Sequence, residues 1–212
     1  MVRVVTWNVN SLRTRADRVE AWLVRHEPDV VLLQETKCPD EDVRVDRFAA
    51  LGYEVAHWGR DHWNGVGILS RVGLSDVRRG FPGPQRPPFD EARLICAMCG
   101  GVRVHSVYVP NGRALDDPHY LYKLVWLERL RSTLLLDGLA VPTIVAGDFN
   151  VAPTDLDIYD PARWRHRTHA SPPERAAMLA LADLGLRDVT REHLPGAGVY
   201  TWWSYRPGQV ER

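Results

Sequence analysis

Polar side chains that could do metal and phosphate chemistry follow several short apolar runs of the sequence. They are Asn8, Asn10, Glu35, Tyr108, Asn111, Asp148 and Asn150. Ligands of layered α/β folds gather at the ends of strands, so these positions are the places to look for a site. Carboxylate and amide oxygens suit hard cations such as Mg²⁺, which also bind substrate phosphate. Together the set could hold a metal, a phosphate and an attacking water, as metal-assisted phosphoester hydrolysis requires.

Each of these residues also has a simpler structural explanation. An Asn after a strand commonly makes a turn, and Asn111-Gly112 is a strong turn signal by itself. Glu35 could be a solvated loop carboxylate and Tyr108 a half-buried strand aromatic. Asp148 and Asn150 flank an aromatic residue and could point the same way at a strand end, although an Asx turn would place them there too. The set therefore carries more weight than its members.

Competing motifs are weaker. Cys96 and Cys99 form a C-x-x-C, but it lies in a strand-like run without a second pair or a following helix, which disfavours zinc and thioredoxin-like sites. The basic segment Arg163–His169 could meet phosphates or be a solvated face. The sequence contains neither a G-x-S-x-G elbow nor a P-loop.

Composition restricts the class of protein. The chain has 212 residues, 27 basic against 27 acidic, and 45% apolar residues, which is ordinary for one globular domain. It lacks the ~18-residue apolar run of a membrane span. Three cysteines favour a reducing cytoplasm over a disulfide framework. Zero net charge counts against a strongly basic nucleic-acid domain, but 25 Arg against 2 Lys leaves room for phosphate-binding arginines.

Strands and helices that could position these residues alternate along the chain. The predicted strands are Arg3–Val9, Asp29–Gln34, Tyr53–Trp58, Gly65–Ser70, Ala92–Met98, Val102–Tyr108, Pro142–Ala146 and Val199–Tyr205. The predicted helices are Thr14–His26, Asp40–Leu51, Pro118–Leu136 and Pro172–Leu184. Four prolines exclude Phe81–Phe89 from any central strand. The mixture predicts α/β layering around a mixed sheet or two packed sheets.

Two details of the helices are also predicted. Thr14 and Asp17 have the spacing of a capping box at the start of the first helix. Leu121, Leu124, Val125 and Glu128 follow the 3.6 period in the longest predicted helix.

Across nearly its whole length the chain resembles the exonuclease III-like AP endonucleases, DNA-repair enzymes of the endonuclease/exonuclease/phosphatase superfamily. The matching segments are TWNVNSLR (Thr6–Arg13), DVVLLQETK (Asp29–Lys37), WNGVGILSR (Trp63–Arg71), DEARLI (Asp90–Ile95), YVPNG (Tyr108–Gly112), YKLVWLERL (Tyr122–Leu130), GDFNVAPTDLD (Gly147–Asp157), SPPER (Ser171–Arg175) and YTWWSYR (Tyr200–Arg206). QET, PNG, GDFN and TWW at these spacings are highly specific together. The resemblance implies a four-layer α/β/β/α sandwich, with the active site where the strand ends of both sheets meet.

The resemblance also implies catalytic roles. Glu35 would be the principal ligand of Mg²⁺, for which Mn²⁺ could substitute, assisted by Asn8. Asp148 would orient or deprotonate the attacking water, and Asn150 would hold the scissile phosphate. Tyr108 would contact the phosphate and the metal network.

Three further residues would contact substrate by the same resemblance. Asn111 would support the phosphate, and Trp202 would pack against a flipped-out abasic sugar, unless it is a core strand aromatic. Some relatives carry Asp where this chain has Asn10, and a neutral Asn leaves hydrogen bonding in place of a direct metal role.

The sequence departs from the family at its C-terminal end. Relatives continue into a strand with an Asp and a last strand with an Asp-His pair, and this sequence stops at Arg212. The catalytic His and its Asp partner are therefore absent, so the chain is either a fragment of a longer gene product, which the ending inside a matched segment favours, or a natural truncation. An R-x-D strand and an S-D-H encoded just downstream would decide between the two. If the chain is complete at this length, we expect little activity, because the loss of an acid–base residue typically lowers the rate by ~10²–10⁴-fold.

The resemblance predicts a Mg²⁺-dependent monomeric nuclease that cleaves double-stranded DNA 5′ to abasic sites or from 3′ ends. Extruding an abasic nucleotide is cheap because it has no base to unstack. Two alternatives remain at this point: a superfamily phosphodiesterase of a small molecule, and a non-catalytic DNA-binding remnant.

Overall fold

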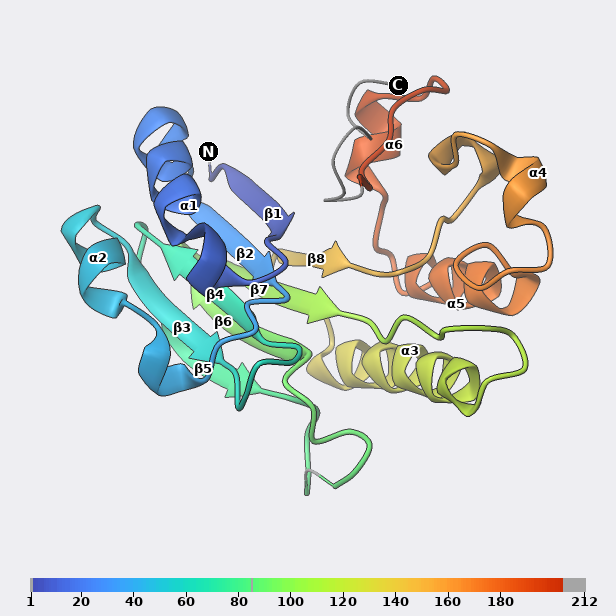
Figure 1. Cartoon of the computed structure of the whole chain (residues 1–212), viewed down its shortest axis with the longest axis horizontal. Helices are drawn as coiled ribbons and strands as arrows, with labels where there is room; N and C mark the ends of the chain where they lie inside the picture. The colour runs from blue at the N-terminus through green and yellow to red at the C-terminus, as the bar shows by residue number, and fades with distance from the viewer. Residues whose placement is uncertain (1, 85, 204–212) are drawn as a thin grey trace. The chain divides into compact units, whose positions relative to one another are not determined.

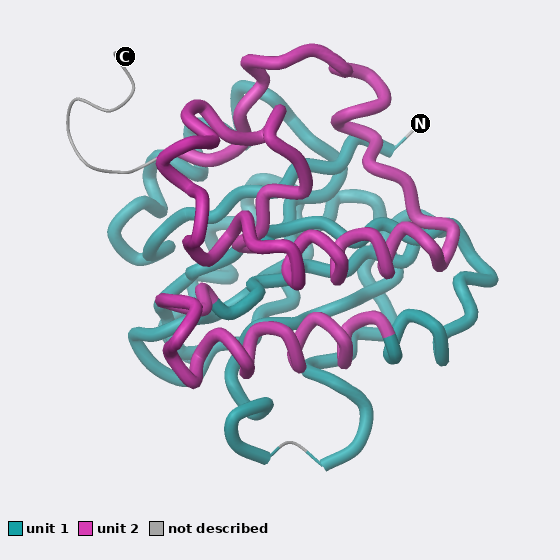
Figure 2. Tube along the Cα trace, turned by 90° about the vertical axis from the view of Figure 1, so that its right-hand side faces the viewer, with its two compact units in different colours: residues 1–110, 132–149 teal, residues 111–131, 150–212 magenta. Residues whose placement is uncertain are grey.

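The computed structural model describes residues 2–84 and 86–203. The chain divides into two compact units, one of residues 1–110 with 132–149 and one of residues 111–131 with 150–212 (Figure 2). Each unit is described by itself. The single domain expected from the sequence therefore stays a prediction.

The first unit contains two four-stranded mixed sheets (Figure 1). The first sheet has the order β1-β2-β4-β3 and consists of β1 (Val4–Asn8), β2 (Val30–Gln34), β3 (Glu54–Trp58) and β4 (Val66–Ser70). The second has the order β5-β6-β7-β8 and consists of β5 (Ser75–Arg79), β6 (Leu94–Cys99), β7 (Val102–Tyr108) and β8 (Thr143–Asp148). Only β1 with β2 and β7 with β8 are parallel among the pairs described; the other pairs are antiparallel.

Strand β2 is apolar throughout because both of its faces are buried. Val30 and Leu32 lie in a core with residues of the second sheet, such as Ile95. Val31 and Leu33 lie in a second core with residues of the helices on the other side of the sheet. Those helices are α1 (Leu12–His26) and α2 (Val45–Ala50). Two facing mixed sheets with helices outside confirm the predicted α/β fold class.

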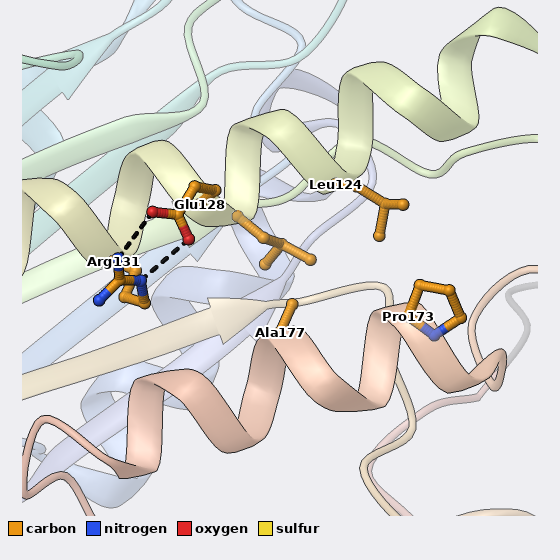
Figure 3. Close-up of a pocket in the computed structure, with 6 residues that line it drawn as sticks. Leu124, Glu128, Arg131, Pro173 and Ala177 are labelled. Carbon is orange, nitrogen blue, oxygen red and sulfur yellow. Dashed lines mark hydrogen bonds and ion pairs between the residues drawn. The ribbon is translucent and has the colours of Figure 1, made fainter.

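The second unit is mainly helical. It holds most of α3 (Pro118–Asp137), together with η2 (Asp155–Asp157), α4 (Pro161–Trp164), α5 (Pro172–Ala182) and α6 (Val189–His193). Within this unit α3 and α5 run side by side and line a pocket of about 180 Å³ (Figure 3). No helix in the described ranges is both long and apolar enough to cross a membrane.

Several predicted elements differ from the structure. Asp40–Leu51 is not one helix but a 3₁₀ turn, η1 (Asp40–Asp42), followed by α2. The cap of α1 is Ser11, whose hydroxyl accepts from Thr14 N at 3.3 Å, not the predicted pair. Strand β5 was not predicted because its residues are all exposed and mostly polar.

Two corrections concern the C-terminal half. Two of the residues that follow the 3.6 period in α3 are exposed, Leu121 at 65% and Val125 at 45%, and the helix buries Trp126 and Leu130 instead. The predicted last strand, Val199–Tyr205, is not a strand over its described residues 199–203, and its remainder lies outside the described residues.

Candidate active site

Four of the predicted site residues form one hydrogen-bonded cluster in the first unit. Asn8 Nδ2 donates to Glu35 Oε1 at 3.1 Å and to Asp148 Oδ2 at 2.8 Å. The Tyr108 hydroxyl donates to the same Glu35 oxygen at 2.8 Å. One amide therefore bridges two carboxylates that lie on different sheets.

Strand pairing explains why these residues meet. In the parallel β1–β2 pair Asn8 lies opposite Gln34, which puts Glu35 one residue beyond the same sheet edge. In the parallel β7–β8 pair Tyr108 lies opposite Asp148. The carboxyl ends of each parallel pair therefore lie at one edge of their sheet. The sheets are tied together nearby, because Gln34 Nε2 donates to Ser106 Oγ at 3.0 Å.

Glu35 is held as a carboxylate by its neighbours. It sits in the left-handed region with φ +50° directly after β2, and its side chain is 19% exposed. Burial works to raise its pKa, but hydrogen bonds from Asn8, Lys37 and Tyr108 outweigh burial and lower the pKa. Lys37 Nζ lies 3.0 Å from Glu35 Oε2. The site thus contains an ionised acid with its own counter-charge.

Tyr108 is a neutral hydrogen-bond donor. Burial, and then the charge of Glu35, raise the pKa of its phenol well above the ordinary value. The Arg93 guanidinium lies 4.6 Å from the Tyr108 ring centroid and bonds in turn to Glu91 at 2.6 Å. This packing holds the ring while its hydroxyl points at Glu35.

Asn10 supports the cluster from the loop after β1. Its backbone N–H donates to Asn8 Oδ1 at 3.0 Å, and this contact orients the Asn8 amide with its NH₂ toward the carboxylates. Its side-chain oxygen accepts from Lys37 Nζ at 2.6 Å. Asn10 also has φ +44°, a conformation that Asn tolerates better than most residues. The role predicted for Asn10 in binding substrate stays a prediction.

The donor set suits a hard cation better than a soft one. No group of three or more His, Cys, Asp and Glu side chains that could hold a metal occurs within the described part of the chain. The cluster instead brings the carboxylates of Glu35 and Asp148 together around the Asn8 amide nitrogen, with the Tyr108 hydroxyl on Glu35. Mg²⁺ typically uses only one or two carboxylates and keeps several waters, so this set fits it.

Two other predicted residues meet in the second unit. Asn111 Nδ2 lies 3.3 Å from Asn150 Oδ1 and 3.1 Å from His169 Nε2, and that nitrogen lies 3.2 Å from Asn150 Oδ1. Burial and the charge of Lys123 lower the pKa of His169, so its ring is neutral near pH 7. These contacts turn Asn150 Oδ1 toward Asn111 and His169, which fixes the orientation of its amide.

Trp202 and the competing motifs can also be placed. Trp202 is 65% exposed, so it is not a core strand aromatic. Cys96 and Cys99 are free and buried in β6. In the basic segment, Thr168 and His169 turn inward while Arg163 is exposed.

The sequence did not single out Lys37 or His169. Lys37 directly follows the QET motif, and its place three residues after the end of a strand is the feature that could have marked it as a site residue. His169 had no comparable local signal, because it was one histidine within a basic segment.

Comparison with known proteins identifies the family of this chain. The family model described as endonuclease/exonuclease/phosphatase family matches residues 5–212. The chain belongs to this family. Exodeoxyribonuclease III of Haemophilus influenzae, a family relative, is 31% identical, and the match covers 97% of this chain and 81% of the relative.

Two solved structures are similar to this chain in sequence and in fold. A 3′-5′ exonuclease from Neisseria meningitidis has a TM-score of 0.94 at 37% identity, and an AP endonuclease from Archaeoglobus fulgidus has 0.92 at 36%. Each match covers 100% of this chain and 82% of the solved chain. The predicted family and the predicted fold of two mixed sheets flanked by helices are therefore confirmed.

Proposed function

We propose that this protein is a metal-dependent DNA-repair nuclease that hydrolyses phosphodiester bonds of duplex DNA, 5′ to abasic sites or from 3′ ends. The observation that carries the proposal is the Asn8 amide that bridges the carboxylates of Glu35 and Asp148. Its support is the similarity to exodeoxyribonucleases and AP endonucleases over nearly the whole chain.

Glu35, assisted by Asn8, would hold Mg²⁺ in this proposal, with Mn²⁺ as a substitute. The bound cation would neutralise charge on the phosphate and stabilise the leaving oxygen. The lowered pKa of Glu35 suits this task, because a ligand carboxylate must be ionised.

The remaining roles belong to side chains of the protein. Asp148, oriented by Asn8, accepts a proton from the attacking water or aligns that water with the phosphorus. Tyr108 stays protonated and donates a hydrogen bond that keeps Glu35 in place. Asn111 and Asn150 present their amides to the scissile phosphate. Preorganised donors of this kind stabilise charge that develops in the transition state.

Trp202 is assigned to lesion recognition. Its indole is 65% exposed and therefore available for packing against an extruded abasic sugar. Extrusion of a nucleotide without a base has little stacking to overcome, so a small aromatic-lined pocket could select it. We further propose a monomer that works in the reducing cytoplasm, consistent with its free, buried cysteines.

A substrate panel tests the proposal. The protein is incubated with a duplex carrying one abasic analogue, a duplex with a recessed 3′ end and a small aryl phosphodiester, each with Mg²⁺ or EDTA. We expect EDTA-sensitive cleavage of DNA only. Cleavage of the small diester alone would indicate a small-molecule phosphodiesterase. Salt-sensitive DNA binding without cleavage would indicate a non-catalytic binder, and either result would contradict the proposal.

A further inference from the structure

The second unit contains an ion pair with no exposure to solvent. Lys123 on α3 and Glu174 on α5 are both 0% exposed, and their ammonium and carboxylate are in direct hydrogen-bonding contact. The chain has 25 arginines but only two lysines, Lys37 and Lys123, and both sit beside a carboxylate at the candidate sites. A buried pair of this kind has a large desolvation cost, so its presence calls for an explanation.

The Lys123 ammonium binds the backbone on which the two predicted phosphate ligands stand. It donates to the carbonyl oxygen of Asn150 at 2.6 Å and to that of Asn111 at 3.3 Å. It also lies 3.4 Å from the Thr168 hydroxyl. One charged group therefore ties together two loops that are 39 residues apart.

The Glu174 carboxylate fixes the segment that carries His169. It accepts the His169 N–H at 2.8 Å and the Thr168 hydroxyl at 2.8 Å. Its other oxygen accepts the N–H and the hydroxyl of Ser171 at 3.0 and 2.6 Å, as in a capping box at the start of α5. The ring of His169 in turn contacts the side chains of Asn111 and Asn150.

The side chain of Lys123 lies close to the loop that follows Asn111. Gly112 has φ +88°, and a Cβ placed there would lie 3.0 Å from Lys123 Cδ and 2.7 Å from Thr168 Oγ1. The methylene stem of Lys123 thus packs directly against the backbone after Asn111. A guanidinium is larger and planar, so Arg would have to displace these neighbours.

We propose that the buried Lys123–Glu174 pair positions Asn111, Asn150 and His169 for contact with the scissile phosphate, which makes Lys123 and Glu174 positioning residues for the reaction. This inference rests on the proposed function, because it takes the asparagines as phosphate ligands. Stability alone is a poor explanation, since apolar replacement of a buried pair is often neutral or stabilising. The pair does, however, form hydrogen bonds with the backbone of Asn111, Asn150 and His169.

The test separates positioning from stability with a double variant. Lys123→Met leaves a buried carboxylate unpaired and should lower Tm and kcat. Lys123→Met with Glu174→Gln removes both charges at nearly constant volume, so Tm should largely recover. The control is Glu128→Gln with Arg131→Met, which removes an exposed pair at 2.8 Å on the same helix (Figure 3).

We expect kcat on duplex DNA to stay at least ~10-fold below wild type in the double variant, with KM changed less than ~3-fold, because misplaced groups act on the transition state. The control pair should match wild type in kcat, KM and Tm. Recovery of kcat together with Tm in the double variant would overturn the proposal, since the pair would then act on stability alone.

A second measurement keeps this test independent of the proposed function. The side-chain amide NMR signals of Asn111 and Asn150 should shift or broaden in the double variant and stay unchanged in the control. Unchanged amide signals in the double variant would overturn the positioning role. A wild type that does not cleave DNA would contradict the proposed function, and the amide signals would still decide the role of the pair.

Discussion

Asn8 Nδ2 lies 2.8 Å from Asp148 Oδ2, so the end of the first strand is bonded to the end of a strand 140 residues later. The same nitrogen bonds Glu35 at 3.1 Å. Loss of this amide should leave both carboxylates without their shared donor, which removes a hydrogen bond that stabilises the charged form of each.

A double-mutant cycle measures that coupling. Asn8→Ala and Asp148→Asn should each lower kcat by ~10²-fold or more, and the double variant should be far less impaired than the product of the two losses. The expected coupling is about 1–3 kcal/mol in the activation free energy. Additive effects would show that the two side chains act independently.

Tyr108→Phe isolates the hydrogen bond to Glu35. The ring and its contact with Arg93 at 4.6 Å should remain, whereas the donor 2.8 Å from Glu35 Oε1 disappears. Because supporting hydrogen bonds to a metal ligand are typically worth 10–100-fold, we expect a loss of ~10–100-fold in kcat/KM with little change in Tm. Tyr53→Phe, which loses a buried hydroxyl bonded to Pro28 O at 2.7 Å, is the matched control and should change Tm but not kcat/KM.

Gly147 allows β8 to approach β7 closely just before Asp148. Its φ is +154°, and a Cβ placed there would lie 2.0 Å from the Val107 carbonyl oxygen. Gly147→Ala should lower the free energy of unfolding by more than about 2 kcal/mol, since neither backbone can yield easily. Gly73→Ala is the control, because φ is +90° there but nothing described lies within 4 Å of its Cβ. It should cost about 1–2 kcal/mol in urea unfolding, and equal losses for both variants would contradict the role of the close approach.

His105 should make stability fall in mild acid. Its side chain is 1% exposed, neither ring nitrogen has a hydrogen-bond partner among the described residues, and burial lowers its pKa to about 4. In the unfolded chain His105 binds a proton near pH 6.5, whereas in the folded chain it does so only near its lowered pKa of about 4. The free energy of unfolding therefore falls as the pH drops from 6.5 toward 4. The expected loss is about 3 kcal/mol.

Urea unfolding between pH 7.5 and 4.5 checks this prediction. His105→Leu should lack the part of the pH dependence due to this group, and an exposed control, His62→Gln, should keep it. Parallel pH curves for wild type and His105→Leu would show that the imidazole is not responsible.

The sequence predicted the strand-end cluster well because the chemistry there is local to each strand. Glu35 and Asp148 each follow an apolar run that forms a buried or half-buried strand. Their meeting depends on two parallel pairings and on the facing of two sheets, which no single segment encodes. The resemblance, not the spacing, supplied that step.

The second cluster was only partly predictable. Helix α3 carries apolar residues on more than one face, so periodicity favoured the exposed Leu121 and missed the buried Lys123. His169 has φ +82° at the end of a basic segment, and its backbone is held by the Glu174 carboxylate and by the N–H of Ala152. The burial of Lys123 could not be predicted from its own helix, because the groups that bind its ammonium, such as Asn150 and Glu174, lie in other segments of the chain.

The most direct test of the central claim is the Mg²⁺ dependence of single-turnover cleavage of an abasic duplex by wild type and by Glu35→Gln, with Arg131→Met as control. We predict that Glu35→Gln raises the Mg²⁺ concentration for half-maximal rate by ~10-fold or more and lowers the maximal rate, while the control follows wild type. A Glu35→Gln protein that cleaves at the wild-type rate with the wild-type Mg²⁺ dependence would contradict the claim that the strand-end cluster is the metal-dependent catalytic site.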